Sequence, residues 1–159
     1  MDSVAETRPT LAELLPQAGP MILLTDYDAP DGERSATARV AVTEKSPFYE
    51  RSLGGVPGCV ALEYMAQTMA LATGMARRAA GLPPKIGFVL GSRSLRISVP
   101  CFAAGSTYTV RVECTYSDES FGSFDCVIRD PSGREAASAT VNAFQPEGDV
   151  SSENMEAYR

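Results

Sequence analysis

The hydrophobic positions of this chain follow two different periods. In residues 33–42, ERSATARVAV, apolar side chains recur at every second position, which indicates a strand with one buried face. The same period of two recurs in residues 106–116, where these side chains share one side: Tyr108, Val110, Val112, Cys114 and Tyr116. Further apolar stretches predict strands over residues 21–28, 85–99, 120–130 and 135–144. The second half of the chain is therefore predicted to be a run of antiparallel strands.

The stretch GCVALEYMAQTMALATGMARRAAG, residues 58–81, has no such alternation. It is apolar or small on nearly every face of a helix, and we expect a helix from about Cys59 to Ala79 that stops at Gly81. A helix of this kind has to be surrounded, and the predicted strands are the only elements large enough to surround it. These elements predict an α+β hot-dog fold, in which a curved antiparallel sheet wraps around one long central helix. A short helix in TLAELLPQAGP, with Thr10 and Glu13 as a capping box, precedes them.

Length and composition place these elements in one domain. The chain has 159 residues, of which 44% are hydrophobic and 21% charged, as in a globular protein. We expect a single hot-dog domain over residues 1–159, with its core at about 10–145 and a flexible polar tail at 146–159. The start lacks the pattern of a secretory signal, and the long helix carries Glu63, so a buried core helix is expected rather than a membrane span.

Cysteine and histidine usage narrows the chemistry. The four cysteines, Cys59, Cys101, Cys114 and Cys126, lack CxxC spacing, and the chain has no histidine, so neither a metal nor another cofactor is expected. Without an export signal we expect reduced thiols and a cytoplasmic location. The net charge of −6 at pH 7 argues against a nucleic acid partner.

The charge is unevenly distributed along the chain. Residues 64–112 contain no acid but six bases: Arg77, Arg78, Lys85, Arg93, Arg96 and Arg111. If these side chains gather on one surface, they suit an acidic or phosphorylated partner. Arg77, Arg78 and Arg93 are the candidate docking residues for such a partner. The alternative is a solvated face whose charge is balanced by acids from elsewhere in the chain.

One charged side chain, Glu63, interrupts the long helix near its start. Backbone N–H groups at a helix N-terminus are unpaired and lie at the positive end of the helix dipole, so they suit a carbonyl oxygen that gains negative charge. Gly58 would allow a ligand to approach this backbone closely. Glu63 is therefore the candidate catalytic residue, and Gly58, Cys59 and Gln67 are candidate substrate-binding residues.

Each of these residues also has a structural interpretation. Gly58 suits an ordinary turn before a helix. Glu63 suits a buried hydrogen-bond network or a dimer contact, with Gln67 four residues further along the same face. Cys59 suits packing as well as a nucleophile in the first helical turn. The three remaining cysteines are expected to pack between strands.

Several segments resemble the 3-hydroxyacyl-carrier-protein dehydratases of bacterial fatty acid synthesis. ELLPQAGPMILL resembles their opening, SPFYERS…GGVPGCVALEYMAQ their active-site loop and helix, and GFVLGSRSLRISVP…AGSTYTVRV the two strands that follow. The similarity covers roughly residues 11–145. LEYMAQ together with GFVLGSR is most similar to the dehydratase-like proteins of aryl-polyene pigment clusters.

The resemblance implies a dimer that holds an acyl thioester between its subunits, with a histidine–carboxylate pair at the reacting carbons. The carboxylate falls on Glu63. The family's histidine lies in a GHFPG-like stretch before the helix, where this chain reads YERSLGG, and a further position that often holds histidine is Gln17 here. Tyr49 and Glu50 lie in the right loop, but a tyrosine is a poor base at neutral pH and a loop glutamate is normally solvated.

We therefore expect a dehydratase-like protein that binds 3-hydroxyacyl thioesters on an acyl carrier protein, in aryl-polyene or fatty-acid-type biosynthesis. Arg77, Arg78 and Arg93 are expected to help dock this acidic carrier protein. The chain is expected to form a homodimer, or a heterodimer with a histidine-bearing dehydratase subunit, and to be inactive or weak alone. One alternative is a self-sufficient dehydratase that uses Glu63 with a partner such as Glu50. Another is a hot-dog acyl thioesterase in which Glu63 activates water, and the last is a basic binding module without a thioester role.

Overall fold

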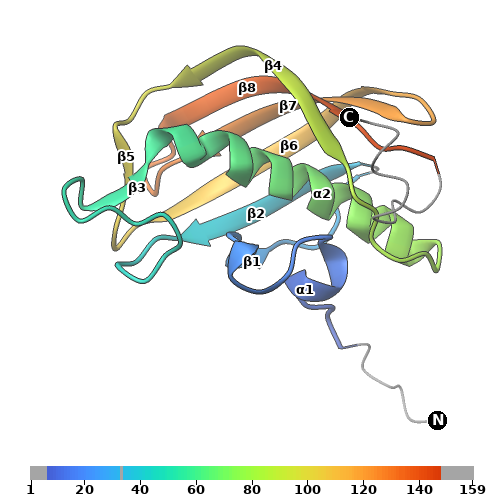
Figure 1. Cartoon of the computed structure of the whole chain (residues 1–159), viewed down its shortest axis with the longest axis horizontal. Helices are drawn as coiled ribbons and strands as arrows, with labels where there is room; N and C mark the ends of the chain where they lie inside the picture. The colour runs from blue at the N-terminus through green and yellow to red at the C-terminus, as the bar shows by residue number, and fades with distance from the viewer. Residues whose placement is uncertain (1–6, 33, 148–159) are drawn as a thin grey trace, which may run out of the picture.

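The computed structural model describes residues 7–32 and 34–147, and its largest element is one antiparallel sheet (Figure 1). Six strands form this sheet in the order β1–β2–β6–β7–β8–β4, and a separate two-stranded sheet joins β3 to β5. The strands are β1 (Asp26–Tyr27), β2 (Ser35–Ala41), β3 (Gly55–Pro57), β4 (Phe88–Ile97), β5 (Cys101–Ala103), β6 (Thr107–Ser117), β7 (Phe121–Arg129) and β8 (Glu135–Phe144). The helical elements are α1 (Leu11–Leu14), the 3-10 turns η1 (Gly19–Met21) and η2 (Gly58–Val60), and the long helix α2 (Ala61–Ala79).

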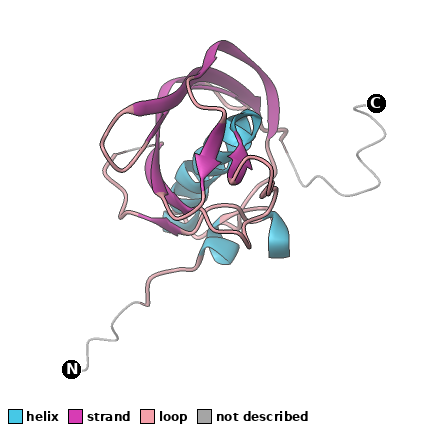
Figure 2. Cartoon of the chain, turned by 90° about the vertical axis from the view of Figure 1, so that its left-hand side faces the viewer, coloured by secondary structure: helices cyan, strands magenta, loops and turns pink. Residues whose placement is uncertain are grey.

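The large sheet curls around α2, as the end-on view in Figure 2 shows. α2 packs against β2, β6 and β7, whose inward side chains form the core together with one side of the helix. Ala38 of β2, Val110 of β6 and Ile128 of β7 are each 0% exposed. The predicted hot-dog fold is therefore confirmed, with a curved antiparallel sheet around one long helix.

The predicted strand over residues 21–28 is wrong for most of its length. Its leucines are buried as expected, but only Asp26 and Tyr27 pair with β2, flanked by backbone hydrogen bonds that the Thr25 and Asp28 N–H groups donate to β2. The side chain of Gln67 bonds to the backbone of residues 21–23 instead. Its Oε1 accepts a hydrogen bond from the Leu23 N–H at 2.9 Å, and its Nε2 donates one to the Met21 carbonyl at 2.7 Å. A helix side chain thus takes the place of a strand partner.

The alternation predicted for residues 106–116 ends before the strand does. The first three members of the predicted apolar side are buried, Cys114 is half-buried, and Tyr116 is 58% exposed. The register between β6 and β7 shifts between Cys114 and Tyr116. This irregularity turns the end of β6 outward, because a bulge changes which side of the sheet the following residues face.

The long helix has nearly the predicted limits. The 3-10 turn η2 precedes it, so regular α-helix begins at Ala61 rather than at Cys59, and it ends at Ala79 as predicted. Gly81 follows with a φ of +73°, a left-handed conformation that glycine adopts without strain at helix ends. Gly74 lies so close to the carbonyl of Leu14 that a Cβ would overlap it. α1 therefore rests directly on the backbone of α2.

The two-stranded sheet of β3 and β5 joins two segments for which the sequence predicts no strand. Gly55 pairs with Ala103, and a Cβ on Gly55 would overlap the backbone of Phe102. The pairing fixes the end of the loop that leads into α2. Of the helices in the described ranges, none is long and apolar enough to span a membrane. The predicted flexible tail lies, beyond Glu147, outside the described residues.

Candidate functional site

The sheet leaves one stripe of α2 uncovered, contrary to the expectation that the helix is surrounded. The side chains of this stripe are half-buried and recur every three or four residues: Glu63, Ala66, Ala70, Thr73 and Arg77. They line a cleft of about 640 Å³, whose opposite wall comes from β4, β7 and β8. Four aromatic side chains contribute to that wall: Phe88, Phe121, Phe124 and Phe144. The walls of this cleft suit a long, mainly apolar ligand.

Glu63 lies in the first turn of α2 and faces the cleft. Its Oε1 accepts a hydrogen bond from Gln67 Nε2 at 3.0 Å, as the spacing of four residues predicts. Gln67 is 0% exposed, and its amide also bonds to the backbone of Met21 and Leu23. Its position supports a role in orienting Glu63, and it does not line the cleft where a substrate contact was expected.

Gln17 lies on the wall of the same cleft, in the segment between α1 and η1. Its Oε1 is buried and accepts no hydrogen bond from the described residues. In the sequence, Gln17 is notable only because 3-hydroxyacyl-carrier-protein dehydratases often have histidine at this position. A buried, unpaired amide oxygen cannot be predicted from one residue letter, since burial depends on tertiary packing.

The structure does not bring Gly58 and Cys59 to the lining of the cleft. The Gly58 N–H donates to the carbonyl of Pro100 at 3.0 Å, and a Cβ there would meet Val99 O and Ile97 Cγ2. Residues 97–100 of the protein therefore occupy the space beside Gly58 that was expected for a ligand. Cys59 is exposed, so the structure does not support the packing role considered for it.

The loop residues weighed as replacements for a histidine also lie outside the cleft lining. Glu50 is exposed, and its carboxylate accepts a hydrogen bond from the Ser52 hydroxyl at 2.8 Å. Its backbone forms an isolated bridge with Gly55, next to β3. Tyr49 is half-buried in the same loop. Within this chain, the arrangement therefore gives Glu63 neither a tyrosine nor a second glutamate from this loop.

The basic residues of the acid-free segment do not form one unpaired surface. Arg78 lies 3.8 Å from Glu13, and Arg111 lies 2.7 Å from Asp31. The Arg111 guanidinium, together with the Ser35 hydroxyl, lowers the pKa of Asp31. Arg77 lines the cleft and its Nε donates to the Pro83 carbonyl at 2.6 Å, while Arg93 is exposed on β4. Acids from elsewhere in the chain therefore balance two of the six charges.

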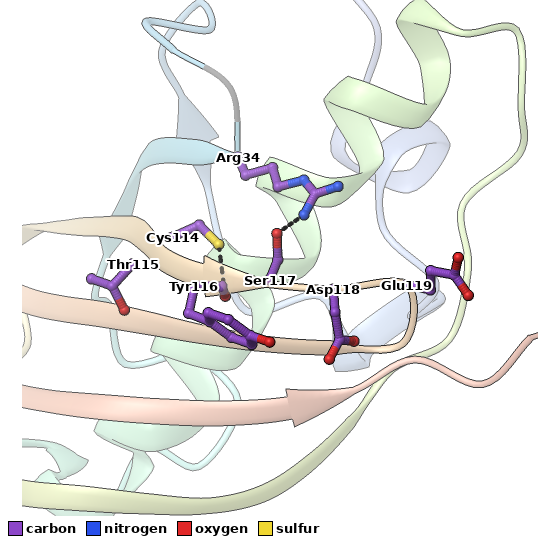
Figure 3. A pocket seen from close by; sticks show the side chains of 7 residues that line it. All are labelled: Arg34, Cys114, Thr115, Tyr116, Ser117, Asp118 and Glu119. Atoms are coloured by element: carbon purple, nitrogen blue, oxygen red, sulfur yellow. Dashed lines mark hydrogen bonds between the residues drawn. The ribbon is translucent and has the colours of Figure 1, made fainter.

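A second hollow, of about 620 Å³, lies beside the hairpin that joins β6 to β7 (Figure 3). Figure 3 shows the Arg34 side chain reaching Ser117, to whose Oγ it donates a hydrogen bond, while Asp118 and Glu119 point away from it. Asp118 has a lowered pKa because its carboxylate accepts hydrogen bonds from the N–H groups of Ser120 and Phe121. No candidate site residue predicted from the sequence lines this hollow. Arg34, Ser117, Asp118 and Glu119 also line the cleft along α2, so the two hollows adjoin.

Chemically, the cleft offers the carboxylate of Glu63 on its helix wall, and the turn between β6 and β7 adds the carboxylates of Asp118 and Glu119. Its cationic lining residues are Arg34, Arg77 and Lys85, of which Arg77 lies in the last turn of α2 and Lys85 follows the helix. Arg77 is 14 residues from Glu63, or about 21 Å along an α-helix. A carboxylate held in this way can take a proton from a bound ligand or give one to it. No described group of His, Cys, Asp and Glu side chains has the arrangement of a metal site.

Comparison with known proteins agrees with this geometry. The family model ApeP-like, described as ApeP dehydratase, matches residues 9–155. Among solved structures, the dehydratase heterocomplex ApeI:P from Xenorhabdus doucetiae contains a chain with 27% identity and a TM-score of 0.83, covering 96% of this chain and 98% of that one. No curated protein matches the chain.

More distant structures share the fold alone. The PaaI protein of the phenylacetic acid degradation operon from E. coli is 16% identical with a TM-score of 0.60, over 79% of this chain and 82% of that one. A hypothetical thioesterase from Streptococcus pneumoniae, solved with coenzyme A, is 17% identical with a TM-score of 0.59, over 80% and 91%. The family match and the dehydratase structure are more specific than these, and they show that the chain belongs to the ApeP-like dehydratases, a hot-dog family of aryl-polyene biosynthesis.

Proposed function

We propose that this chain binds a 3-hydroxyacyl thioester on an acyl carrier protein and contributes Glu63 to a dehydratase site that a partner subunit completes. The observation that carries the proposal is Glu63 itself. Its carboxylate is bonded to Gln67 and faces the cleft along α2, in a chain that has no histidine. The four free cysteines suit a protein that works in a reducing cytoplasm.

Dehydration of a 3-hydroxyacyl thioester requires two proton transfers. A base removes a proton from C2 while the C2=C3 double bond forms, and an acid protonates the hydroxyl on C3, which leaves as water. A histidine–carboxylate pair divides these tasks between two groups. Glu63 alone would have to act first as base and then as acid, so a histidine from a second subunit is the missing part.

The edge of the sheet offers a place for that subunit. β4 is the last strand of the large sheet and pairs on one side only, with β8. Several of its apolar side chains are exposed, by 39% to 61%: Val89, Leu90, Leu95 and Ile97. An exposed apolar edge strand is a template for pairing with another chain. The structure similar to this chain is described as a heterocomplex, which supports a related but different partner.

Cationic side chains on the cleft support docking of the carrier protein. Arg77 lies in the last turn of α2 on the cleft wall, and Lys85 lines the cleft close by in sequence. With Arg78 and Arg93, these side chains would attract an acidic carrier protein and bring its acyl chain to the opening.

Two other functions use the same carboxylate. A self-sufficient dehydratase would need Glu63 to exchange both protons, and Glu50 lies outside the cleft that it would have to share. A thioesterase would need Glu63 to activate water next to the thioester carbon. The thioesterase neighbours share the fold alone, so they do not favour this reaction over dehydration.

The test is turnover of a 3-hydroxyacyl carrier-protein thioester by the purified chain, with and without a histidine-bearing homologue of the same family. We expect very slow or no turnover by the chain alone, since loss of one general acid–base group costs about two to four powers of ten in rate. Adding the homologue should restore turnover. Glu63→Gln in this chain should then lower the restored rate by a similar factor.

Glu50→Gln is the matched control, because it makes the same change in the adjacent exposed loop. It should leave the restored rate within about twofold of the unmodified complex. Fast turnover by the isolated chain, abolished by Glu63→Gln, would instead establish a self-sufficient dehydratase. Release of the free acid would establish a thioesterase.

A further inference from the structure

Gln17 is held beside α2 by contacts on either side of it in the chain. Before it, the carbonyl of Leu14 lies so close to Gly74 that a Cβ on this glycine would overlap it. After it, the carbonyl of Met21 accepts a hydrogen bond from Gln67 Nε2 at 2.7 Å. Gln17 lies between these two contacts and lines the cleft. The residue is therefore beside α2, between the levels of Gln67 and Gly74.

This level falls between the carboxylate and the cation on the helix wall. Glu63 lies in the first turn of α2 and Arg77 in its last turn, and both line the cleft. Along the helix, Gln17 is roughly 6 to 16 Å from Glu63, whereas Arg77 is about 21 Å from it. A ligand that extends along the cleft from Arg77 to Glu63 therefore has to pass Gln17.

The carboxamide oxygen of Gln17 is unpaired, unlike that of Gln67. Gln67 Oε1 accepts a hydrogen bond from the Leu23 N–H at 2.9 Å. Gln17 Oε1 is buried on the cleft wall and receives no hydrogen bond from the described residues. A buried acceptor without a donor is unfavourable, so folding alone does not explain an amide at this position. A ligand in the cleft can supply the missing donor, which must be an N–H or O–H group because Oε1 only accepts.

The proposed function determines which part of the ligand passes Gln17. An acyl chain on a carrier protein is held as a thioester at the end of a phosphopantetheine arm, whose phosphate is attached to the carrier protein. With the carrier protein docked at Arg77 and the reacting carbons at Glu63, the arm occupies the stretch between them. The acyl chain then continues on the other side of the reacting carbons, away from Gln17.

The arm carries donors at the depth of Gln17. Two amide groups lie along its middle, between the sulfur and the end that bears the phosphate, and each has an N–H. Its hydroxyl is nearer the phosphate, and therefore nearer Arg77 and the carrier protein. The amide N–H groups are thus the donors that best match an acceptor placed between the two ends of the cleft.

We propose that Gln17 accepts a hydrogen bond at Oε1 from an amide N–H of the pantetheine arm and so positions the arm in the cleft. This inference rests on the proposed function, because it assumes a carrier-protein thioester with its reacting carbons at Glu63. Gln17 takes no part in the proton transfers. A site that accepts such a bond discriminates against arms that lack the donor, because its own buried oxygen is then left unpaired.

The test compares arms that differ in a single donor. An acyl carrier protein is loaded with a thioester of a saturated acyl chain, which has no 3-hydroxyl and therefore binds without reacting. In two analogues, one amide N–H of the arm at a time is replaced by an ester oxygen, which keeps the length of the arm but removes the donor. Binding to the complex of this chain with its histidine-bearing homologue is measured by calorimetry.

One of the two analogues should bind about tenfold more weakly than the parent thioester, because the buried oxygen again lacks a donor. In Gln17→Met this preference for the amide should disappear, since the side chain no longer offers an acceptor. Without a ligand, the Gln17→Met complex should be at least as stable to heat as the unmodified complex, because the substitution removes an unpaired buried oxygen. Weaker binding would then not be a consequence of a damaged fold.

Gln145→Met is the matched control. Gln145 also lines the cleft, but its Nε2 donates to the Lys85 carbonyl at 3.2 Å. This variant should keep the preference for the amide. Gln17→Glu, which retains an acceptor oxygen, should keep it as well and provides a second variant if Gln17→Met does not fold.

The outcomes separate the role of Gln17 from the proposed function. Equal binding of the parent and both analogues, or a preference for the amide that survives Gln17→Met, would overturn the role of Gln17 and leave the proposed function standing. Weaker subunit association in Gln17→Met, with the preference unchanged, would show that the oxygen bonds to the partner subunit instead. Failure of the parent carrier-protein thioester to bind would overturn the proposed function itself.

Discussion

At the scale of single residues, Gln67 joins the fold to the candidate site. Its side chain is fully buried and connects Glu63 of the cleft to the backbone at Met21 and Leu23. The carboxylate is thereby oriented by a group that also fixes the N-terminal segment. Stability and the geometry of the site are coupled at this one amide.

Replacing this amide by an apolar side chain of similar size should therefore destabilise the protein. Gln67→Leu leaves the Met21 carbonyl and the Leu23 N–H without partners, at a cost of about 1–3 kcal/mol for each buried group. Urea denaturation would measure the loss in the free energy of unfolding. Gln145→Leu, with one hydrogen bond at a half-buried position, should cost less. Equal losses in the two variants would show that the buried network adds little.

Residue-level prediction from the sequence succeeds where the partners are close in the chain. The capping box of α1 is present, with the Thr10 N–H donating to Glu13 Oε2 at 2.6 Å, and the Gln67–Glu63 bond follows from helical spacing. The buried oxygen of Gln17 and the packing of Gly58 could not be predicted. Both depend on segments that are distant in sequence, α2 for Gln17 and residues 97–100 for Gly58.

At the scale of elements, the two hydrophobic periods predict the long helix and the long strands. The short strands β1, β3 and β5 have too few residues to show a period, and pairing with distant segments defines them. The open stripe on α2 was missed for another reason. Its alanines and threonine are small enough to fit a covered face equally well, so the sequence cannot distinguish a core face from a cleft wall.

The contact between α1 and α2 gives a prediction at this scale. Gly74→Ala should destabilise the protein by about 1–3 kcal/mol, although alanine is the better helix former by about 1 kcal/mol. The new Cβ would overlap the Leu14 carbonyl, which is backbone and can move only if α1 shifts. Thermal denaturation followed by circular dichroism would measure the change.

Gly91→Ala on β4 is the control for this substitution, because a Cβ there meets no heavy atom within 4 Å. Its effect should stay within about 0.5 kcal/mol. A stabilised Gly74→Ala protein would mean that helix propensity outweighs the contact and that α1 is free to move away from α2.

At the scale of the whole molecule, the two ends of α2 carry opposite charges. The carboxylate of Glu63 lies in the first turn of α2, whereas Arg77 and Arg78 lie in its last turn. Asp118 and Glu119, from the turn between β6 and β7, also line the cleft. The cations also suit the negative end of the helix dipole, so a part of their role is structural. Under the proposed function, the same cations would receive the acidic carrier protein, and the arm that carries the thioester would extend from there along the cleft toward Glu63.

Reversing the two charges tests this arrangement. Arg77→Glu with Arg78→Glu should weaken carrier-protein binding about tenfold at low salt, because two attractive contacts become repulsive. The loss should shrink as salt is raised, since exposed charges are screened over about 10 Å at 0.1 M ionic strength. The ion pair that Arg78 makes with Glu13 is about half exposed, so its loss should cost little stability.

The control is Arg129→Glu with Arg134→Glu, the same change on exposed arginines around the turn between β7 and β8. It should leave carrier-protein binding within about twofold. Equal weakening by both double variants would indicate a general effect of net charge, and binding that ignores Arg77 and Arg78 would place the carrier protein elsewhere.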